Sequence, residues 1–311
     1  MCVDCAQPRA ATAPSPHALW RNLGAERLAP PFGRWAIGSD AADDSNDRMT
    51  LVSPSRSAST ARRAERTLRP FFGFYGGKWR DALKHYPPPA HGVIVEPFAG
   101  SAGYSVRYPN RKVILGEKDP VISGVWDYLI HASAQDILAI PDLAPGQTVA
   151  DLPICQEARW LVGFWLNRGA SRPRTGPSAW MRDGIRPGSF WGERVRQTIA
   201  GQVDRIRHWQ VFNCSYEELP FSGEATWFVD PPYQKQGQHY HHGAENLDFT
   251  ALGTWCQARR GQVIVCENDG ADWLLFSPLA DVKTTRARSR SVEVVWIREG
   301  HGAGRTKEPA A

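Results

Sequence analysis

The arrangement of short apolar runs along the chain is the feature that most limits its fold. Five runs rich in β-branched and aromatic residues are bounded by turn residues or charges, at 93–95, 113–115, 211–212, 227–229 and 263–265. Runs of this length and composition are typical of strands that are buried on both faces of a parallel sheet. Because longer mixed segments separate the runs, the sequence predicts an α/β fold.

Two further patterns add detail to this sheet. Helices are expected at 123–131 and 249–260, in segments that lie between strands. The apolar stretches at 282–285 and 292–297 are close enough in sequence to pair with each other. We expect them to form an antiparallel hairpin at the edge of the sheet.

Residues 132–208 form an insertion that is too long for an ordinary connection between two strands. Arginines are interleaved with aromatic residues throughout it. One interpretation is a mainly helical subdomain with a solvated basic face, and the other is a lobe that binds nucleic acid through its arginines. On the second interpretation, the candidate DNA-binding residues of the insertion are Arg168, Arg172, Arg174 and Arg182.

The two ends of the chain differ in composition from the middle. Residues 1–68 are rich in Pro, Ala, Ser and Arg without periodicity, which predicts a disordered extension, and Met49 is an alternative start. The tail at 300–311 is expected to be flexible. The folded domain is therefore predicted at 69–131 and 209–299, on either side of the insertion.

Composition narrows the class of protein. The net charge of +5 is compatible with a nucleic-acid partner but does not require one. No run is apolar enough to span a bilayer, and no signal peptide follows Met1, so a cytoplasmic location is expected. Of the six cysteines, Cys2 and Cys5 form a CxxC pair without a second pair at zinc-finger spacing. We expect reduced thiols and no metal site.

The strongest chemical motif is the tetrad Asp230-Pro231-Pro232-Tyr233, which directly follows a predicted strand. A carboxylate at the carboxyl end of a buried strand lies where open α/β sheets bind ligands. The prolines stiffen the turn, so that an Asp230 oxygen and the Pro231 carbonyl can accept both hydrogens of one NH2 group. The Tyr233 ring offers a face on which a base can stack. The tetrad therefore predicts a site for a planar amine, with an ordinary loop as the alternative.

Two other motifs indicate a nucleoside-containing ligand. The run at 93–95 leads into a glycine-rich turn, Glu96-Pro-Phe-Ala-Gly-Ser-Ala-Gly103, where a ligand can approach the backbone closely. Glu117 follows about 20 residues later, a spacing that suits an acid on ribose hydroxyls, and Asp119 competes for this role. In Phe74-Tyr-Gly-Gly-Lys78, a tight turn would let Lys78 reach a carboxylate, and a turn that only packs on the core is the alternative.

Taken in order, four motifs resemble those of the Dam-type DNA adenine methylases, especially their shorter phage and prophage members. The motifs are Phe74-Tyr-Gly-Gly-Lys78, Glu96-Pro-Phe-Ala-Gly100, Asn213-Cys-Ser-Tyr216 and Asp230-Pro-Pro-Tyr233. The resemblance covers about 71–297. It implies a Rossmann-like sheet that binds S-adenosylmethionine, and it makes the insertion a target-recognition lobe for double-stranded DNA.

The resemblance also implies a role for each matching position. The tetrad would present a flipped adenine for transfer of a methyl group to its N6 amine. Phe74 and Lys78 would contact the base and the methionine carboxylate of the cofactor, and Glu117 would bind its ribose. The full set of implied cofactor-binding residues is Phe74, Tyr75, Lys78, Phe98, Gly100, Glu117, Ser215, Tyr216 and Asp230.

Two positions depart from the family pattern, and several alternatives stay open. Ala102 replaces the usual second glycine of the cofactor loop, although Gly103 follows, and Phe74 replaces a Trp or Tyr; we expect altered cofactor affinity rather than inactivity.

The polar loop after the tetrad, with Lys235 and His239, is expected near DNA phosphates rather than at a metal. The alternatives are cytosine N4, RNA or a protein glutamine as acceptor, a catalytically silent DNA-binding protein, and an NAD-dependent oxidoreductase. The sequence leaves open the target site and the oligomeric state, including a monomer, and implies no partner nuclease.

Overall fold

The computed structural model describes residues 67–167, 169–182, 190–235, 244–283 and 290–300. The expected disordered extension, except for its last two residues, and the tail from 301 lie outside these ranges. So do Arg168 and His239. The expectations for these residues stay predictions.

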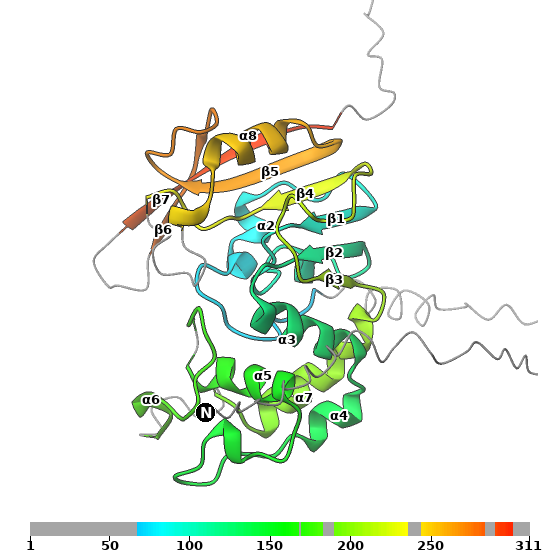
Figure 1. Ribbon diagram of the computed structural model, residues 1–311, viewed down its shortest axis with the longest axis vertical. Coiled ribbons are helices and arrows are strands. Elements are labelled where there is room, and N and C mark those ends of the chain that lie inside the picture. Colours follow the sequence, from blue (N-terminus) through cyan, green and yellow to red (C-terminus); the bar gives the residue numbers. More distant parts are fainter. Residues whose placement is uncertain (1–66, 168, 183–189, 236–243, 284–289, 301–311) are drawn as a thin grey trace, which may run out of the picture. The chain divides into compact units, whose positions relative to one another are not determined.

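Seven strands form one mixed sheet in the order β3-β2-β1-β4-β5-β7-β6 (Figure 1). The pairings among the first five strands are parallel, and β7 runs antiparallel to both β5 and β6. The strands are β1 (Val93–Glu96), β2 (Lys112–Gly116), β3 (Gln210–Phe212), β4 (Ala225–Val229), β5 (Gly261–Asn268), β6 (Ser277–Lys283) and β7 (Arg290–Arg298).

The five predicted apolar runs are thus confirmed as β1 to β5, and the predicted hairpin is confirmed as β6 and β7. Its second strand, β7, lies next to β5, so that β6 alone forms this edge of the sheet. The order of the parallel strands reverses between β1 and β4, because the chain builds outward from β1 to β3 and then returns to the other side of β1. Open α/β sheets bind ligands at such a reversal, beside the carboxyl ends of the strands.

The central strands are buried because their side chains alternate between two cores, one on each face of the sheet. On β1, Ile94 belongs to the first core and Val95 to the second. On β4, Phe228 points into the first core, whereas Trp227 points into the second. This arrangement explains why the runs read as continuously apolar.

Within the described ranges, four helices of nine or more residues accompany the sheet: α3 (Pro120–His131), α5 (Gln156–Leu166), α7 (Glu193–Val203) and α8 (Phe249–Gln257). The two predicted helices are confirmed as α3 and α8. Helix α3 begins at Pro120, earlier than expected, because the Asp119 side chain accepts a hydrogen bond from the Val121 amide at 2.9 Å and caps the helix. The shorter helical elements are η2 (Lys78–Arg80), α2 (Ala82–His85), η3 (Ser105–Arg107), α4 (Ala134–Ala139), η4 (Val149–Asp151), α6 (Ala179–Arg182), η5 (Asp204–Ile206) and η7 (Ala244–Asn246).

The insertion at 132–208 carries α4 to α7 and shares the first core with the sheet. Phe164 of α5 and Ile199 of α7 are fully buried there, together with Trp126 of α3. In Figure 1, these helices lie beyond the β3 edge of the sheet, where α5 packs against α3 and α7 packs against α4. The described part of the insertion is therefore helical, and its apolar residues are continuous with the core of the sheet.

The N-terminal boundary of the folded chain differs from the prediction. Leu68 was expected in the disordered extension, but it is buried in the first core, and its amide donates a hydrogen bond to the Val106 carbonyl at 2.9 Å. The apolar contact outweighs the irregular composition of the preceding residues. Among the helices in the described ranges, none has the length and apolar composition needed to cross a membrane.

Candidate functional site

A cavity of about 260 Å³ lies at the carboxyl ends of β1, β2, β3 and β4, where the order of the parallel strands reverses. Most of its lining comes from the segments that directly follow these strands and from the Phe74–Lys78 segment, and Ser171 and residues 246–248 also contribute. All nine residues that the family resemblance assigned to the cofactor line this cavity: Phe74, Tyr75, Lys78, Phe98, Gly100, Glu117, Ser215, Tyr216 and Asp230. The fold thus brings together residues that are up to 156 positions apart in the sequence.

The glycine-rich turn after β1 is held in place from both sides. Gly100 has a φ of +47°, a backbone conformation that favours glycine, and its amide donates to Glu117 Oε2 at 2.9 Å. Its carbonyl accepts a hydrogen bond from Trp126 Nε1 at 2.8 Å. A Cβ atom on Gly100 would lie 3.0 Å from the ring of Phe74, so the absence of a side chain lets the Phe74 ring approach the turn.

Ala102 and Gly103 show how the turn accommodates an alanine at the position where the resemblance leads one to expect a second glycine. Ala102 is buried and has a φ of +47°, so the turn places a non-glycine residue in the left-handed region at a cost of about 1–2 kcal/mol. The close approach is made at Gly103 instead. A Cβ there would lie 2.7 Å from the Lys78 amide nitrogen and 2.8 Å from that of Trp79. Gly103 therefore lets the backbone of η2 pack directly on the turn.

Glu117 is oriented by two backbone amides at the end of β2. Its Oε2 accepts from Gly100 and its Oε1 accepts from Asp119 at 3.0 Å. Burial raises the pKa of Glu117 to about 7, which these hydrogen bonds partly oppose. Each oxygen retains a lone pair that can accept from a ligand hydroxyl. Asp119, its competitor from the sequence, also lines the cavity, but one of its oxygens caps α3.

A flat aromatic surface lies on another side of the cavity. Phe98 and Tyr216 stack with ring centroids 5.6 Å apart and an angle of 28° between their planes. Beside them, Glu218 Oε2 accepts from both the amide and the hydroxyl of Ser215 at 3.0 Å, which fixes the backbone before Tyr216. Such a surface suits the ring of a nucleobase.

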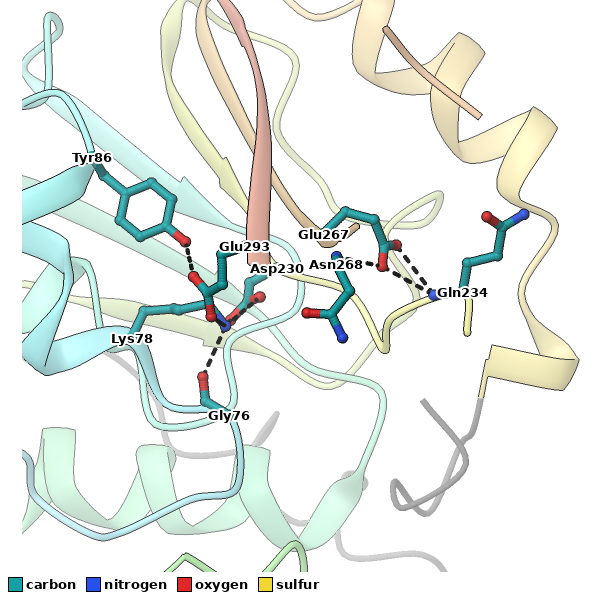
Figure 2. A network of polar contacts seen from close by, with 8 residues as sticks. All are labelled: Gly76, Lys78, Tyr86, Asp230, Gln234, Glu267, Asn268 and Glu293. Atoms are coloured by element: carbon teal, nitrogen blue, oxygen red, sulfur yellow. Dashed lines mark hydrogen bonds and ion pairs between the residues drawn. The ribbon is translucent and has the colours of Figure 1, made fainter. Parts of the chain in front are cut away.

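The tetrad carboxylate forms an ion pair with Lys78 (Figure 2). Lys78 Nζ lies 3.0 Å from Asp230 Oδ1 and 3.1 Å from Oδ2, and it donates to the Gly76 carbonyl at 2.9 Å. Burial lowers the pKa of the Lys78 ammonium, but the Asp230 carboxylate and nearby groups outweigh it and raise this pKa well above its usual value. Burial raises the pKa of Asp230, and Lys78 opposes that shift.

The other members of the tetrad occupy different places. Pro232 lines the cavity with Asp230, whereas Pro231 and Tyr233 do not contribute to its lining. The Tyr233 ring packs against the first core, and its centroid lies 4.9 Å from Lys78 Nζ, a distance that suits a cation–π contact. The ammonium is therefore surrounded by tetrad residues on two sides.

Several polar residues near the tetrad were not singled out by any sequence motif. Glu293 of β7 places Oε1 3.9 Å from Lys78 Nζ, and its Oε2 accepts from the Tyr86 hydroxyl at 2.8 Å (Figure 2). Glu267 of β5 accepts from the amide of Gln234 at 3.2 Å and so fixes the backbone after the tetrad. Burial raises the pKa of Glu267 to about 7. No local pattern marks these acids, because strand pairing brings them to the tetrad.

Glu96 is a further acid whose role the sequence left unassigned. It is the first residue of the glycine-rich motif, is buried, and accepts a hydrogen bond from the Ser105 amide at 2.7 Å. Burial raises the pKa of its carboxyl to about 8. Glu96 is one of six acidic side chains in the cavity lining against two lysines; these charged residues are Glu96, Glu117, Asp119, Glu217, Asp230, Asp248, Lys78 and Lys118.

The predicted DNA-binding residues are placed apart from the cavity lining. Arg172, Arg174, Arg182 and Lys235 are exposed, and none of these four lines the cavity. Within the described insertion, Ser171 is the residue that reaches the lining. Three of these four exposed basic side chains thus belong to the described part of the insertion, and the fourth lies at the end of the tetrad segment.

Comparisons with known proteins add little to this picture. No protein-family model and no curated protein matches the sequence. One solved structure, described as a conserved hypothetical protein from Streptococcus pyogenes, matches with 12% sequence identity and a TM-score of 0.30. The match covers 68% of this chain and 88% of that chain. A likeness of this degree supports no argument about function.

Proposed function

We propose that this protein is an S-adenosylmethionine-dependent DNA methyltransferase that acts on the N6 amine of adenine. The observation that carries the proposal is that Asp230 of the tetrad lines the same cavity as the glycine-rich turn and Glu117. An acceptor for an amine and the features of a nucleoside site therefore meet at the ligand-binding edge of an α/β sheet.

The residues of the cavity fit S-adenosylmethionine. Glu117 offers two oriented oxygens for ribose hydroxyls, and the stacked pair of Phe98 and Tyr216 offers a surface for the adenine ring. Acidic side chains outnumber lysines in the lining, and once pH exceeds the raised pKa values of Glu96 and Glu117 their negative charge favours a ligand with a positively charged sulfonium. The same excess disfavours the diphosphate of NAD, and the described lining residues include no arginine to bind one.

The chain itself would position the acceptor rather than form a covalent bond with it. Bound S-adenosylmethionine would supply a methyl group that its sulfonium already activates, with S-adenosylhomocysteine as the leaving group and one proton of the amine released. An Asp230 oxygen and the Pro231 carbonyl would accept the two hydrogens of the adenine amine and direct the nitrogen lone pair toward the methyl group. Because this amine is inside the duplex, the base would be flipped out of the stack to reach Asp230. The surrounding carboxylates favour the positive charge that develops on the nitrogen.

Double-stranded DNA is the partner that this proposal requires. The exposed side chains of Arg172, Arg174 and Arg182 in the insertion, with Lys235 after the tetrad, would contact phosphates. These contacts orient the duplex but do not specify a sequence. A chain that acts on one adenine at a time has no need of a second copy, so a monomer is proposed.

The test is incubation of the purified protein with S-adenosylmethionine and unmethylated duplex DNA, followed by digestion and mass spectrometry of the nucleosides. N6-methyladenine is the expected product. The Asp230→Asn variant keeps the volume of the side chain but removes its charge, and we expect it to bind cofactor and to lose at least about a hundred-fold in transfer rate. Asp127→Asn, on the exposed side of α3, is the matched control, and we expect it to retain full activity.

Each alternative acceptor gives a different result in this experiment. Detection of N4-methylcytosine would identify cytosine as the target base. Methylation of RNA but not of DNA would identify RNA as the substrate. Cofactor and DNA binding without any methylated product would indicate a catalytically silent DNA-binding protein. If Asp230→Asn is as active as the wild-type protein, the tetrad has no role in methyl transfer and the proposed mechanism is wrong.

A further inference from the structure

Lys78 is shared between two carboxylates that come from different parts of the sheet. Its Nζ contacts both oxygens of Asp230, at 3.0 and 3.1 Å, and lies 3.9 Å from Glu293 Oε1 (Figure 2). The ammonium donates hydrogen bonds to the Gly76 carbonyl and to Asp230 Oδ2, and Asp230 Oδ1 lies within ion-pair distance. Glu293 is therefore within ion-pair distance of Lys78 but is not its principal partner.

This arrangement conflicts with the role of Asp230 as the acceptor for an amine. A cation on both oxygens weakens the carboxylate as a hydrogen-bond acceptor, and it opposes positive charge developing on a nitrogen nearby. Asp230 alone with Lys78 would be a neutral pair. With Glu293 included, one cation and two carboxylates lie together, so the group keeps an excess negative charge even when Lys78 stays in place.

Glu293 is built to receive the cation. The Tyr86 hydroxyl donates to its Oε2 at 2.8 Å, which holds the carboxylate and leaves Oε1 on the side of Lys78. Its backbone is fixed by the antiparallel pairing of β7 with β5, in which Glu293 lies opposite Asn268. A displacement of the ammonium by about 1 Å would bring it from 3.9 Å to the normal length of a charge-assisted hydrogen bond. Glu293 and Lys78 are both buried, so water competes little for either group.

We propose that Glu293 is a positioning residue that draws Lys78 away from Asp230 when the target amine binds, and so frees the tetrad carboxylate to accept it. This inference rests on the proposed function. It assigns no contact with substrate or cofactor to Glu293, which acts through Lys78 alone.

A double-mutant cycle tests this dependence. Glu293→Gln removes the charge while keeping the size of the side chain, and Lys78→Gln keeps a donor next to Asp230 without the cation. Single-turnover methyl transfer is measured for the wild-type protein, the two single variants and the double variant, with S-adenosylmethionine affinity measured by calorimetry. Glu299→Gln changes an exposed acid after β7; it is the matched control, and we expect it to match wild type.

We expect Glu293→Gln to lower the transfer rate about ten-fold with unchanged cofactor affinity, because Lys78 then stays on Asp230. In the Lys78→Gln background, the same substitution should change the rate less than about two-fold. Tyr86→Phe removes only the hydroxyl that holds Glu293, and it should lower the transfer rate by less than Glu293→Gln does, again with unchanged cofactor affinity. It takes the place of Glu293→Gln in the test if circular dichroism shows that Glu293→Gln does not fold.

Three results would overturn the inference. The first is wild-type activity of Glu293→Gln. The second is an equal loss in both backgrounds, which would mean that Glu293 stabilises the fold independently of Lys78. The third is weaker cofactor binding at an unchanged transfer rate, which would place Lys78 on the cofactor. An inactive wild-type protein would instead count against the proposed function.

Discussion

Lys78 and Asp230 are 152 positions apart in the sequence, yet Nζ of the lysine lies 3.0 Å from Oδ1 of the aspartate. Lys78 belongs to the short η2 element before the sheet, and Asp230 directly follows the central strand β4. The ion pair therefore ties the N-terminal segment of the folded chain to the ligand-binding edge of the sheet. Because the pair is buried, removal of Lys78 leaves the Asp230 carboxylate without the cation that compensates it.

Lys78→Gln should destabilise the protein, and more strongly at high pH. Burial already raises the pKa of Asp230 above its unfolded value, and loss of the cation raises it further. A carboxyl with a raised folded pKa binds its proton more tightly in the folded state, so stability falls as pH rises through this range. We expect a loss of about 3 kcal/mol in the free energy of unfolding at pH 8 and a smaller loss at pH 5.

Chemical denaturation at the two pH values measures this difference. Lys84→Gln changes an exposed lysine of α2 and serves as the control, with little effect at either pH. An equal loss for Lys78→Gln at pH 5 and pH 8 would contradict the assigned ion pair.

Gly103→Ala should reduce both stability and activity. The added Cβ would lie 2.7 Å from the Lys78 amide and 2.8 Å from the Trp79 amide, so the backbone of η2 must move. Overpacking of this kind costs about 1–3 kcal/mol in the free energy of unfolding, and it shifts the glycine-rich turn that lines the cavity and holds Glu117. Gly92→Ala adds the same methyl group where no atom lies within 4 Å, and thermal unfolding of this control should stay close to wild type.

The affinity for S-adenosylmethionine should rise with pH. The pKa of Glu117 is raised to about 7, and its ionised form is the stronger acceptor for ribose hydroxyls. Binding therefore favours the deprotonated acid, strengthens as pH rises through about 7, and then levels off. Calorimetric titration of wild type and Glu117→Gln from pH 6 to pH 8 checks this, since the variant should bind more weakly and lose that part of the pH dependence. A variant with the wild-type profile would exclude Glu117 as the ribose acid.

Arg172→Ala should weaken DNA binding without changing cofactor binding. If this exposed arginine contacts one phosphate, its removal reduces the slope of log K against log salt by about 1. Fluorescence anisotropy with a labelled duplex measures the slope between about 50 and 200 mM salt. Over this range, DNA affinity that depends on phosphate contacts falls steeply. Arg111→Ala changes an exposed arginine at the amino end of β2, whereas the cavity lies at the carboxyl ends of the strands; it is the control and should leave the slope unchanged. Identical slopes for all three proteins would remove Arg172 from the DNA interface.

Much of the fold was predictable because local sequence carries the relevant physics. The runs that became β1 to β5 are apolar along their whole length, as burial on both faces requires, and the helices α3 and α8 follow ordinary periodicity. The start of α3 was missed because it depends on a side-chain cap at Asp119 rather than on apolar spacing. Leu68 was missed because a single core contact overrides an irregular local composition.

The candidate site was predictable in part for the same reason. The tetrad and the glycine-rich turn are contiguous motifs, each placed after a strand that the sequence predicts. Glu267 and Glu293 could not be found in this way, since each is one acid among apolar strand residues. Glu267 lies beside the tetrad because β5 pairs with β4, and Glu293 lies there because β7 pairs with β5; both pairings are long-range choices of the folded chain.

The sequence by itself determined the class of fold, the strands and the chemical identity of the residues at their ends, because burial and turn formation depend mainly on near neighbours in the chain. Only the tertiary structure decided which of these residues share one cavity and which charges meet. Strand order determines these contacts, and it depends on burying both faces of the whole sheet at once. The Lys78 ion pair with Asp230, and the approach of Glu293 to it, are results of that order.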